Sequence, residues 1–479
     1  MRRSGTGVGC VFHRPLRRCP TFGRHGAGST AGESSMKRLA VLVLLLPALV
    51  SAAGISTGDT SRRALSKAME ELDDAQRERF ASGRGLFDQM WVIAPSTDEA
   101  VDGLGPVYNR ISCVACHPGN GRGRAPDAES EEMRSMLVRL SIPGVGEHGG
   151  PLPHPAYGEQ LNEQGVPGVP GEGRIAVKYQ DIPLFLHGGT GVTLRKPSLV
   201  WREAHYGTPD GVLTSARIGP ALVGMGLLEA VPEAEILKWA DPDDKNQDGI
   251  SGRANTVWDA AVQQNALGRF GLKANVATLR QQIAGAFIGD LGITSPLFPH
   301  ENCSMAETAC ARTVNGGNPE LSAVQLDDIT FYHQTLAIPE RRQRDTAQVQ
   351  RGQQLFQQAQ CAACHRPMLY TAANAKPDLL SQRIIEPYSD LLLHDMGEPL
   401  ADGRPDFAAN GYEWRTPPLW GIGLAEAVGD QVHYLHDGRA RNLLEAIVWH
   451  RGEAAASQQA VWAMTVEDRE ALLAFLRSL

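Results

Sequence analysis

The spacing of apolar and polar residues predicts two pairs of helices in this chain of 479 residues. Apolar side chains recur at helical intervals over 62–81 and 345–358. Two further amphipathic helices are predicted to begin at Ser322 and Thr465, because each of these residues can cap a helix and is followed three positions later by an amide or acidic side chain. In the first half, the segment 143–216 lies between the two predicted helices and is rich in glycine and proline, which predicts an insertion of loops with short strands.

The two halves of the chain repeat the same parts in the same order. A Gly-x-x-Leu-Phe segment comes first, a PxLxGxGLxEA segment comes later, and a helix carrying Glu-x-x-x-Trp follows. Together with the closing helix, four elements recur in one order, which indicates duplication of one structural unit. The segments are 83–87, 220–230 and Glu235/Trp239 in the first half, and 352–356, 417–427 and Glu445/Trp449 in the second.

A CxxCH box follows the first helix of each half. The boxes are Cys113-Val-Ala-Cys116-His117 and Cys361-Ala-Ala-Cys364-His365. This spacing is the attachment signature of c-type haem, in which two thiols bond to the haem vinyl groups and the histidine binds the iron. A thioredoxin-like pair and a zinc knuckle are the alternatives, but zinc needs further nearby ligands and a thiol pair does not need the histidine. Two covalently bound c-type haems are therefore expected.

We expect a mainly α protein made of two cytochrome c-like haem domains with long irregular loops. A helix before the box and a closing helix after it are the elements that enclose the haem in such a domain. The first domain is predicted over 54–340, with the insertion and an Asp-rich loop, and the second over 341–479.

Residues 1–53 have the composition of a leader. The first 35 residues are basic and glycine-rich, and Met36 opens a short charged region, an apolar run over 39–50 and small residues over 51–53. This order is typical of a secretory signal peptide, so Met36 is expected to be the true start. The apolar run is too short to form a stable membrane span; a retained anchor is the alternative. The mature protein is expected in the periplasm.

Charge and cysteine content agree with an exported redox protein. Beyond residue 53 the chain has 38 basic and 53 acidic side chains, a formal charge of −15. This negative charge argues against nucleic-acid binding and suits a basic redox partner or a small neutral substrate. Cys303 and Cys310 lie outside the boxes, and in an oxidising compartment they are expected to form a disulfide. A redox-active free pair is the alternative.

The second axial ligand should distinguish the two haems. Each box supplies one ligand, His117 or His365. Alignment of the two Glu-x-x-x-Trp helices places His450 where the first half has Ala240. His450 is therefore expected to cap the second iron and to leave the first open, unless His450 is an ordinary buried or surface histidine. Alternative sixth ligands for the first iron are His187, His205 and Tyr206.

An open iron that reduces peroxide needs an acid/base group beside it, which takes a proton from one oxygen and returns it to the other. Glu229 and Glu235 are the candidates, because both are near the place where the second half puts its ligand. Arg217 is the candidate for stabilising charge on the departing oxygen. A structural or surface role is the alternative for each.

An Asp-rich loop over 241–252 predicts a calcium site. Asp244, Asn246 and Asp248 place oxygen atoms at alternate positions before a glycine, as in calcium-binding loops. The acidic residue expected at the twelfth position is replaced by Asn255. An Asp-rich turn without an ion is the alternative.

Several longer motifs join these features. They are 102–106, 112–117, 224–230, 248–253, 267–275, 389–397, 415–420 and 435–440. On these motifs nearly all of the mature chain resembles the bacterial di-haem oxidoreductases, also described as peroxidases and thiol oxidoreductases. These are relatives of di-haem cytochrome c peroxidase and of the di-haem enzyme that matures methylamine dehydrogenase. The resemblance implies calcium between the haem domains. It also implies a peroxidatic glutamate, which the helix position assigns to Glu235 and the GLLEA motif to Glu229.

The resemblance also bears on the ligand of the second haem. In the peroxidase relatives, a histidine that opens an HDG motif is followed fourteen residues later by the methionine that caps the C-terminal haem. Here His436 opens the motif and His450 stands fourteen residues later. The resemblance thus implies His450 as ligand, with imidazole in place of a thioether. Because imidazole stabilises ferric iron more strongly, a lower potential is expected.

The expected function is that of an exported di-haem c-type cytochrome with peroxidase-like activity. Electrons from a small redox protein, such as a cytochrome or cupredoxin, would enter at the second haem. Hydrogen peroxide or a similar small substrate would be reduced at the first. The alternatives are a pure electron-transfer cytochrome and a di-haem enzyme that oxidises a protein or thiol.

Overall fold

Strands contribute far more to this fold than the helical pattern suggests. The computed structural model describes residues 54–479. The structure has about 30% helix and 21% strand with many small sheets, so the expectation of a mainly α protein is wrong. The predicted leader and signal peptide lie outside the described residues. The helices are α1 Asp74–Asp88, α2 Met225–Glu229, α3 Glu233–Leu237, α4 Leu279–Ala286, α5 Ala323–Gln334, α6 Ala347–Gln358, α7 Ala425–Val428, α8 Leu443–Trp449, α9 Ala455–Ala463 and α10 Val466–Ser478.

Most strands are short pieces of two to four residues, and a few strands pair segments far apart in the chain. The strands are β1 Ser56–Thr57, β2 Val92–Ile93, β3 Asp102–Leu104, β4 Val107–Tyr108, β5 Met136–Val145, β6 Pro151–Leu152, β7 Gln164–Gly165, β8 Gly173–Phe185, β9 Gly191–Ala204, β10 Leu213–Ile218, β11 Thr256–Asp259, β12 Gln264–Leu267, β13 Ile338–Pro339, β14 Leu369–Tyr370, β15 Ile384–Ile385, β16 Leu393–Asp395 and β17 Glu413–Arg415. Among the described residues, β10-β5-β6 is a three-stranded sheet and the other sheets are two-stranded. Strands this short give no periodic signal that a sequence pattern could detect.

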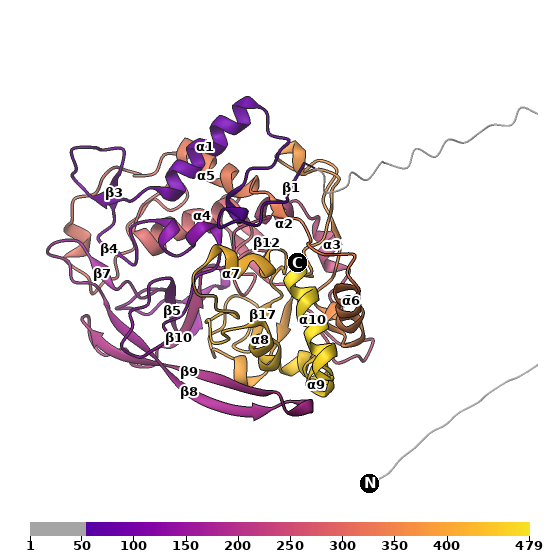
Figure 1. Cartoon of the computed structure of the whole chain (residues 1–479). Coiled ribbons are helices and arrows are strands. Elements are labelled where there is room, and N and C mark those ends of the chain that lie inside the picture. Colours follow the sequence, from indigo (N-terminus) through magenta and orange to yellow (C-terminus); the bar gives the residue numbers. More distant parts are fainter. Residues whose placement is uncertain (1–53) are drawn as a thin grey trace, which may run out of the picture. The chain divides into compact units, whose positions relative to one another are not determined.

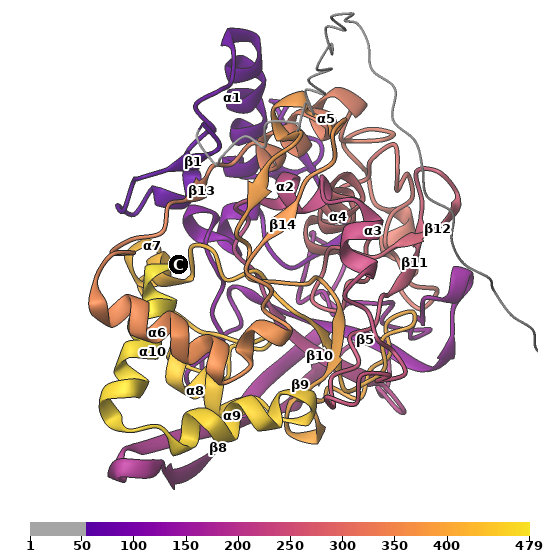
Figure 2. The same ribbon diagram turned by 90° about the vertical axis from the view of Figure 1, so that its right-hand side faces the viewer.

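Two helix crossings organise the two halves. Helix α1 packs on α5, and α6 packs on α10 (Figures 1 and 2). The predicted start of α5 is confirmed, because Ser322 and Gln325 form a reciprocal capping box. The Thr465 side chain accepts from the backbone N–H of Asp468 and begins α10 as expected.

The first predicted helix is displaced along the chain. It was expected over 62–81, but α1 starts at Asp74 and continues to Asp88. Asp73 causes this shift, because its side chain accepts from the backbone N–H of Gln76 and the Gln76 side chain bonds back to the Asp73 backbone. The helix therefore includes the Gly-x-x-Leu-Phe segment instead of ending before it.

A glycine stands at the centre of each crossing. A Cβ atom on Gly83 of α1 would lie 2.2 Å from the carbonyl oxygen of Asp328 in α5. A Cβ atom on Gly352 of α6 would lie 1.9 Å from the carbonyl oxygen of Ala471 in α10. Asp328 and Ala471 occupy the same position counted from the caps of their helices. The two halves thus share the same backbone contact, as duplication of one unit requires.

The insertion over 143–216 contains loops with the short strands β6 and β7, as expected, and also a long hairpin that was not predicted. Strands β8 and β9 pair antiparallel from Gly173↔Ala204 to Phe185↔Gly191. Figure 1 shows the hairpin running beneath β10 and then beneath α8 and α9. At its tip, Arg469 of α10 donates to the carbonyl oxygen of His187 at 2.9 Å. The insertion therefore ties the first half of the chain to the second.

The buried cores also join the halves. The largest cluster of buried apolar residues extends from Ile55 to Val428 and includes Leu380, Leu392 and Trp420 from the second half. A second cluster combines α6, α8 and α10 with Leu194 of the hairpin. Residues 54–479 belong to one compact unit by their contacts. The boundary between two haem domains near residue 340 stays a prediction.

Within residues 54–479, none of the helices combines the length and the apolar character that a membrane crossing requires.

The crossing of α1 and α5 generates a prediction with a control in the same helix. Gly83→Ala should lower the free energy of unfolding by about 2–3 kcal/mol, because the added methyl group meets a backbone carbonyl that cannot move freely. Gly85→Ala should have no cost or stabilise by up to ~1 kcal/mol, because nothing lies within 4 Å of its Cβ position and alanine favours the helix. Urea unfolding of the holoprotein measures both. Equal effects of the two changes would contradict the close crossing.

Candidate haem sites

The two CxxCH boxes form the same local structure. Each begins with a short 3-10 turn, over Cys113–Ala115 and Cys361–Ala363. The backbone N–H of each histidine donates to the carbonyl oxygen of the first cysteine at 3.0 Å. This turn brings the first cysteine and the histidine of each box to the wall of one cavity, where attachment of a porphyrin requires them.

The imidazoles of the two boxes are held in the tautomer that binds iron. His117 Nδ1 lies 2.8 Å from the carbonyl oxygen of Pro220, and His365 Nδ1 lies 2.8 Å from that of Tyr388. A carbonyl oxygen only accepts, so Nδ1 carries the proton and Nε2 keeps its lone pair for a metal. Burial lowers the pKa of His117, and it lowers that of His365 to about 4. Both rings are therefore neutral, as ligation requires.

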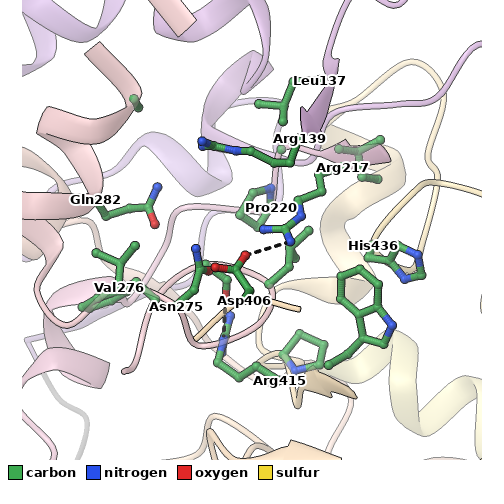
Figure 3. A pocket seen from close by; sticks show the side chains of 18 of the residues that line it. Leu137, Arg139, Arg217, Pro220, Asn275, Val276, Gln282, Asp406, Arg415 and His436 are labelled. Atoms are coloured by element: carbon green, nitrogen blue, oxygen red, sulfur yellow. Dashed lines mark hydrogen bonds and ion pairs between the residues drawn. The ribbon is translucent and has the colours of Figure 1, made fainter. Parts of the chain in front are cut away.

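Both boxes open into one cavity of about 1270 Å³. Its walls include Cys113, His117, Cys361 and His365 together with α4, α8 and the Arg415–Leu419 segment. Figure 3 shows a part of it, where Arg217 points toward Asp406, with Arg415 below them and His436 to one side. Small-molecule pockets typically have about 300–1,000 Å³. A cavity that exceeds this range and reaches both boxes is large enough to suggest more than one large group.

Two observations test whether these residues fit haem. The Trp420 indole N–H lines the cavity, is buried, and has no hydrogen-bond partner within residues 54–479. Such a donor fits the carboxylate of a haem propionate. Burial raises the pKa of Cys113, Cys116 and Cys361 to about 12. These thiols lack the low pKa of a thioredoxin-like pair, so the residues fit haem attachment better than thiol exchange.

A zinc knuckle is not formed either. Within the described part of the chain, the one cluster with metal-ligand spacing consists of Cys364, Asp390 and His394. It falls short of the four ligands of a structural zinc site. His394 also has both ring nitrogens bonded to carboxylates, so neither is free for a metal.

The family model whose description reads "Di-haem oxidoreductase, putative peroxidase" matches residues 51–479. The chain belongs to this di-haem oxidoreductase family. No match was found among curated proteins. A solved structure of hydrazine synthase from Kuenenia stuttgartiensis is similar to 38% of the chain at 16% identity, with a TM-score of 0.22. That match covers 65% of the hydrazine synthase chain, slightly less than two thirds, and is too weak to support an argument about function.

One helix of each half of this di-haem oxidoreductase lines the cavity with the same register. Thr278 caps α4 and Asn442 caps α8, each by accepting from the backbone N–H three residues later. Positions 1, 4, 5 and 8 after the cap face the cavity in both helices. They are Leu279, Gln282, Ile283 and Ala286 in α4, and Leu443, Ala446, Ile447 and His450 in α8. This spacing defines one face of a helix.

His450 has the orientation of a second axial ligand. It ends α8, and its Nδ1 donates to the carbonyl oxygen of Ala446 at 2.7 Å, which leaves Nε2 for a metal. His365 and His450 line the same cavity, and burial together with the nearby His450 lowers the pKa of His365 to about 4. His450 is fully within the cavity wall and not an ordinary surface histidine.

The counterpart of His450 in the first half is Ala286. Alignment of the Glu-x-x-x-Trp helices pointed to Ala240, which is wrong. Helix α3 ends at Leu237, and the residues that follow lead into the Asp-rich loop. The caps of α4 and α8 give the correct pairing, with alanine opposite histidine. The three alternative ligands lie outside the cavity; His187 is at the hairpin tip, and His205 and Tyr206 bond to the carbonyl oxygens of Gly171 and Pro170.

The structure does not place the two candidate glutamates in the cavity. The carboxylate of Glu229 accepts from the backbone N–H of Leu279 at 2.7 Å and from Gln334 at 2.8 Å, so it joins α2 to α4 and α5. Glu235 forms an ion pair with Lys238 on α3 at 2.7 Å. Both positions are structural and give no support to a catalytic role. The sequence similarity between the two Glu-x-x-x-Trp segments suggested that these glutamates lie close to the first haem site, but the fold does not place them there.

Arg217 does line the cavity. Its Nη2 lies 3.1 Å from Asp406 and its Nε donates to Ser215 at 3.1 Å (Figure 3). Arg404 bonds the same carboxylate at 3.0 Å. Burial would raise the pKa of Asp406, but the two guanidinium groups hold it below its usual value. Arg217 is therefore a charged group fixed at the cavity wall.

Three polar residues near the first box were not found from the sequence. Gln282 stands on α4 one turn before Ala286. Asp290, in the π-helical segment Phe287–Leu291, raises the pKa of Cys113 through its charge and accepts from Gln160 at 2.8 Å. Burial and the charge of Glu320 raise the pKa of Glu301 to about 7. All three line the cavity, and no local motif announces them.

His333 is a further buried imidazole that the sequence reasoning missed. It lies on α5, its Nδ1 donates to the carbonyl oxygen of Ile329 at 2.7 Å, and its ring meets Phe87 edge-on. Burial and the nearby His117 lower its pKa to about 4. Counted from the helix caps, its counterpart in α10 is Leu476. His333 also lines the cavity, and its helix α5 packs on α4 as well as on α1, so this imidazole lies at the wall of the first site.

The two remaining sequence features have different outcomes. Cys303 and Cys310 form the expected disulfide, which removes the free-pair alternative.

In the Asp-rich loop, Asp244 accepts from the backbone N–H of Gly249, and Asp248 accepts from that of Ile250 and from the side chain of Asn246. These bonds form turns within the loop. Calcium binding stays a prediction.

The raised pKa of Glu301 predicts a pH dependence of stability. The folded protein holds this proton up to about pH 7, whereas the unfolded chain releases it near 4.5. Its contribution to stability is therefore fully present below pH 4.5 and is lost as the pH rises to about 7. Relative to Glu301→Gln, the wild type should lose about 1–2 kcal/mol between pH 5 and 8, less than a fully buried shift would give. Urea unfolding at both pH values measures this difference; a constant difference would contradict the shift.

Proposed function

We propose that this di-haem oxidoreductase is an exported peroxidase with two covalently attached c-type haems, in which electrons enter at the second haem and hydrogen peroxide is reduced at the first. The observation that carries the proposal is the difference between α4 and α8. Gln282 and Ala286 face the cavity in the first half where Ala446 and His450 face it in the second. A histidine closes one site, and an alanine leaves room for a small ligand at the other.

The chain supplies ligands, hydrogen bonds and protons. His117 and His365 would bind the irons, and His450 would be the second ligand at the closed site. When bound, the haems supply the transfer of two electrons to peroxide. Reduction of hydrogen peroxide to two waters also takes up two protons, and the residues near Ala286 can manage these protons.

Gln282 and Glu301 have complementary chemistry for this task. The amide of Gln282 can donate to one peroxide oxygen and accept from the other, because it has both N–H groups and a carbonyl. With a pKa of about 7, Glu301 can both release and recover a proton near neutral pH. The guanidinium of Arg217 adds positive charge to the cavity wall, which favours a departing oxygen that carries negative charge.

Export and the electron donor complete the proposal. The signal peptide over 36–53, the two boxes and the Cys303–Cys310 disulfide all suit the periplasm, where thiols are oxidised and c-type haem is attached. The acidic mature chain suits a basic small redox protein, such as a cytochrome or cupredoxin, as donor. Electrons enter at the second haem in this account because its iron has no free position for peroxide.

The test is steady-state reduction of hydrogen peroxide with a reduced cytochrome as donor. Gln282→Ala should lower kcat/KM for peroxide by about 10²-fold, because removing one positioned hydrogen-bond donor at a reacting oxygen typically has an effect of this size. Electron uptake by the second haem, followed by its absorbance after mixing with the donor, should be unchanged.

Glu235→Gln is the control, and it should retain wild-type activity because Glu235 pairs with Lys238 outside the cavity. Loss of activity in Glu235→Gln with normal activity in Gln282→Ala would restore the assignment made from the sequence. A wild type that takes up electrons but turns over no peroxide with any donor would instead support an electron carrier. Peroxide consumption that oxidises only a protein or thiol would support the third class.

A further inference from the structure

The chain turns sharply directly after His450. His450 is the C-cap that follows Trp449, the last residue of α8, and its ψ of 129° takes the backbone out of the helix. The next residues form a short turn over Gly452–Ala454, and Gly452 has a φ of +57°. A Cβ atom on Gly452 would lie 2.2 Å from the carbonyl oxygen of Asp395. The turn is therefore packed backbone against backbone on β16.

Glu453 fixes this turn with four hydrogen bonds. Its carboxylate accepts from His394 Nδ1 at 2.7 Å and from the hydroxyl of Ser251 at 2.5 Å. It also accepts from the backbone N–H groups of Ser251 at 3.2 Å and Asp395 at 3.3 Å. Two separate segments, at Ser251 and at His394–Asp395, thus hold one carboxylate, whose side chain is only 11% exposed. Such a set of charge-assisted bonds is stronger than neutral ones.

His394 makes this anchor a charged one. Its Nε2 lies 2.9 Å from Asp390, while Nδ1 faces Glu453. A neutral imidazole has one N–H group, and both nitrogens here need a proton to bond to carboxylates. The ring is therefore an imidazolium, and the two carboxylates hold its pKa well above the usual value. It also lies 3.6 Å from the Cys364 sulfur, next to the second box.

The first half has no such anchor at the corresponding place. After Ala286 the chain does not leave the helix but continues into the π-helical segment Phe287–Leu291. The bonded turn accompanies the helix that ends in a histidine and is missing from the one that ends in an alanine. This contrast associates the anchor with the ligand rather than with the scaffold that both halves share.

We propose that Glu453, held by His394 and Ser251, is a positioning residue that keeps His450 on the iron of the second haem. The inference rests on the proposed role of His450. The N-terminal side of His450 is fixed by α8, but this helix has only seven residues and is marginal on its own. Glu453 fixes the chain three residues beyond the ligand. With both sides fixed, the imidazole loses little freedom when it binds, and it competes better with water or added ligands.

Glu453→Ala tests this role in the ferric holoprotein. The low-temperature EPR signal of the low-spin second haem should fall by more than half. Added cyanide should then bind that haem at least about tenfold more tightly, because loss of a partner that orients a metal ligand typically costs 10–100-fold in ligation. Glu453→Gln keeps the shape of the side chain but has a single acceptor oxygen, so it can keep only one of the two backbone bonds and should retain more of the signal than Glu453→Ala but less than the wild type. Ser251→Ala, which removes one bond, should give an intermediate result.

Glu413→Ala is the control for general destabilisation. Glu413 is also a buried glutamate, but its carboxylate bonds to Arg253 and to the backbone N–H of Asn410. It should lower the unfolding midpoint and leave the low-spin signal and cyanide affinity unchanged. Wild-type ligation in both Glu453→Ala and Ser251→Ala would overturn the proposed anchor. A low-spin signal that survives in His450→Ala would show instead that His450 is not the ligand.

Discussion

The hydrogen bond from an imidazole Nδ1 to a backbone carbonyl is the interaction on which both sites depend. It occurs at His117, at His365 and at His450, with distances of 2.7–2.8 Å. In each case it fixes the tautomer and the direction in which Nε2 points. The carbonyl groups come from Pro220, from Tyr388 and from α8 itself, so the loops and helices around the boxes have to be in place before iron can be bound. The helix crossings and the hairpin provide that frame.

A duplicated frame has acquired two different sites through few side-chain changes. The glycine contacts at α1/α5 and α6/α10 and the caps of α4 and α8 are equivalent in the two halves. On this common background, one helix presents Gln282 and Ala286 and the other presents Ala446 and His450. Helices with the same backbone thus present a histidine that can occupy the second ligand position of one haem and an alanine that leaves this position free at the other. Glu301, which would handle protons, lies in the loop after the π-helical segment Phe287–Leu291, and this segment has no counterpart beyond α8.

Local signals in the sequence were sufficient for some features and not for others. The cap at Ser322 and the Cys303–Cys310 disulfide depend on residues within ten positions of one another, and both were predicted correctly. The two CxxCH boxes are equally local, and haem attachment at them stays a prediction. The fold class was wrong because β8, β9 and the short ladders are defined by partners, not by their own periodicity. The assignment of Glu229 and Glu235 as catalytic residues finds no support in the structure for a related reason. The Glu-x-x-x-Trp motif shows that two segments are similar in sequence, but it does not show that they occupy equivalent positions around the cavity. Pairing α4 with α8 needed the caps that only the structure shows.

The central claim is that one haem is closed by His450 and the other is open at Ala286. Low-temperature EPR of the fully oxidised holoprotein tests it most directly, with His450→Ala and Ala286→His measured beside the wild type. The account predicts one high-spin and one low-spin ferric signal in the wild type. The low-spin signal should be lost in His450→Ala, and the high-spin signal should be converted to low-spin in Ala286→His. Two low-spin signals in the wild type, unchanged in Ala286→His, would contradict the claim and would point to another ligand at the first haem, with His333 the nearest buried imidazole to His117.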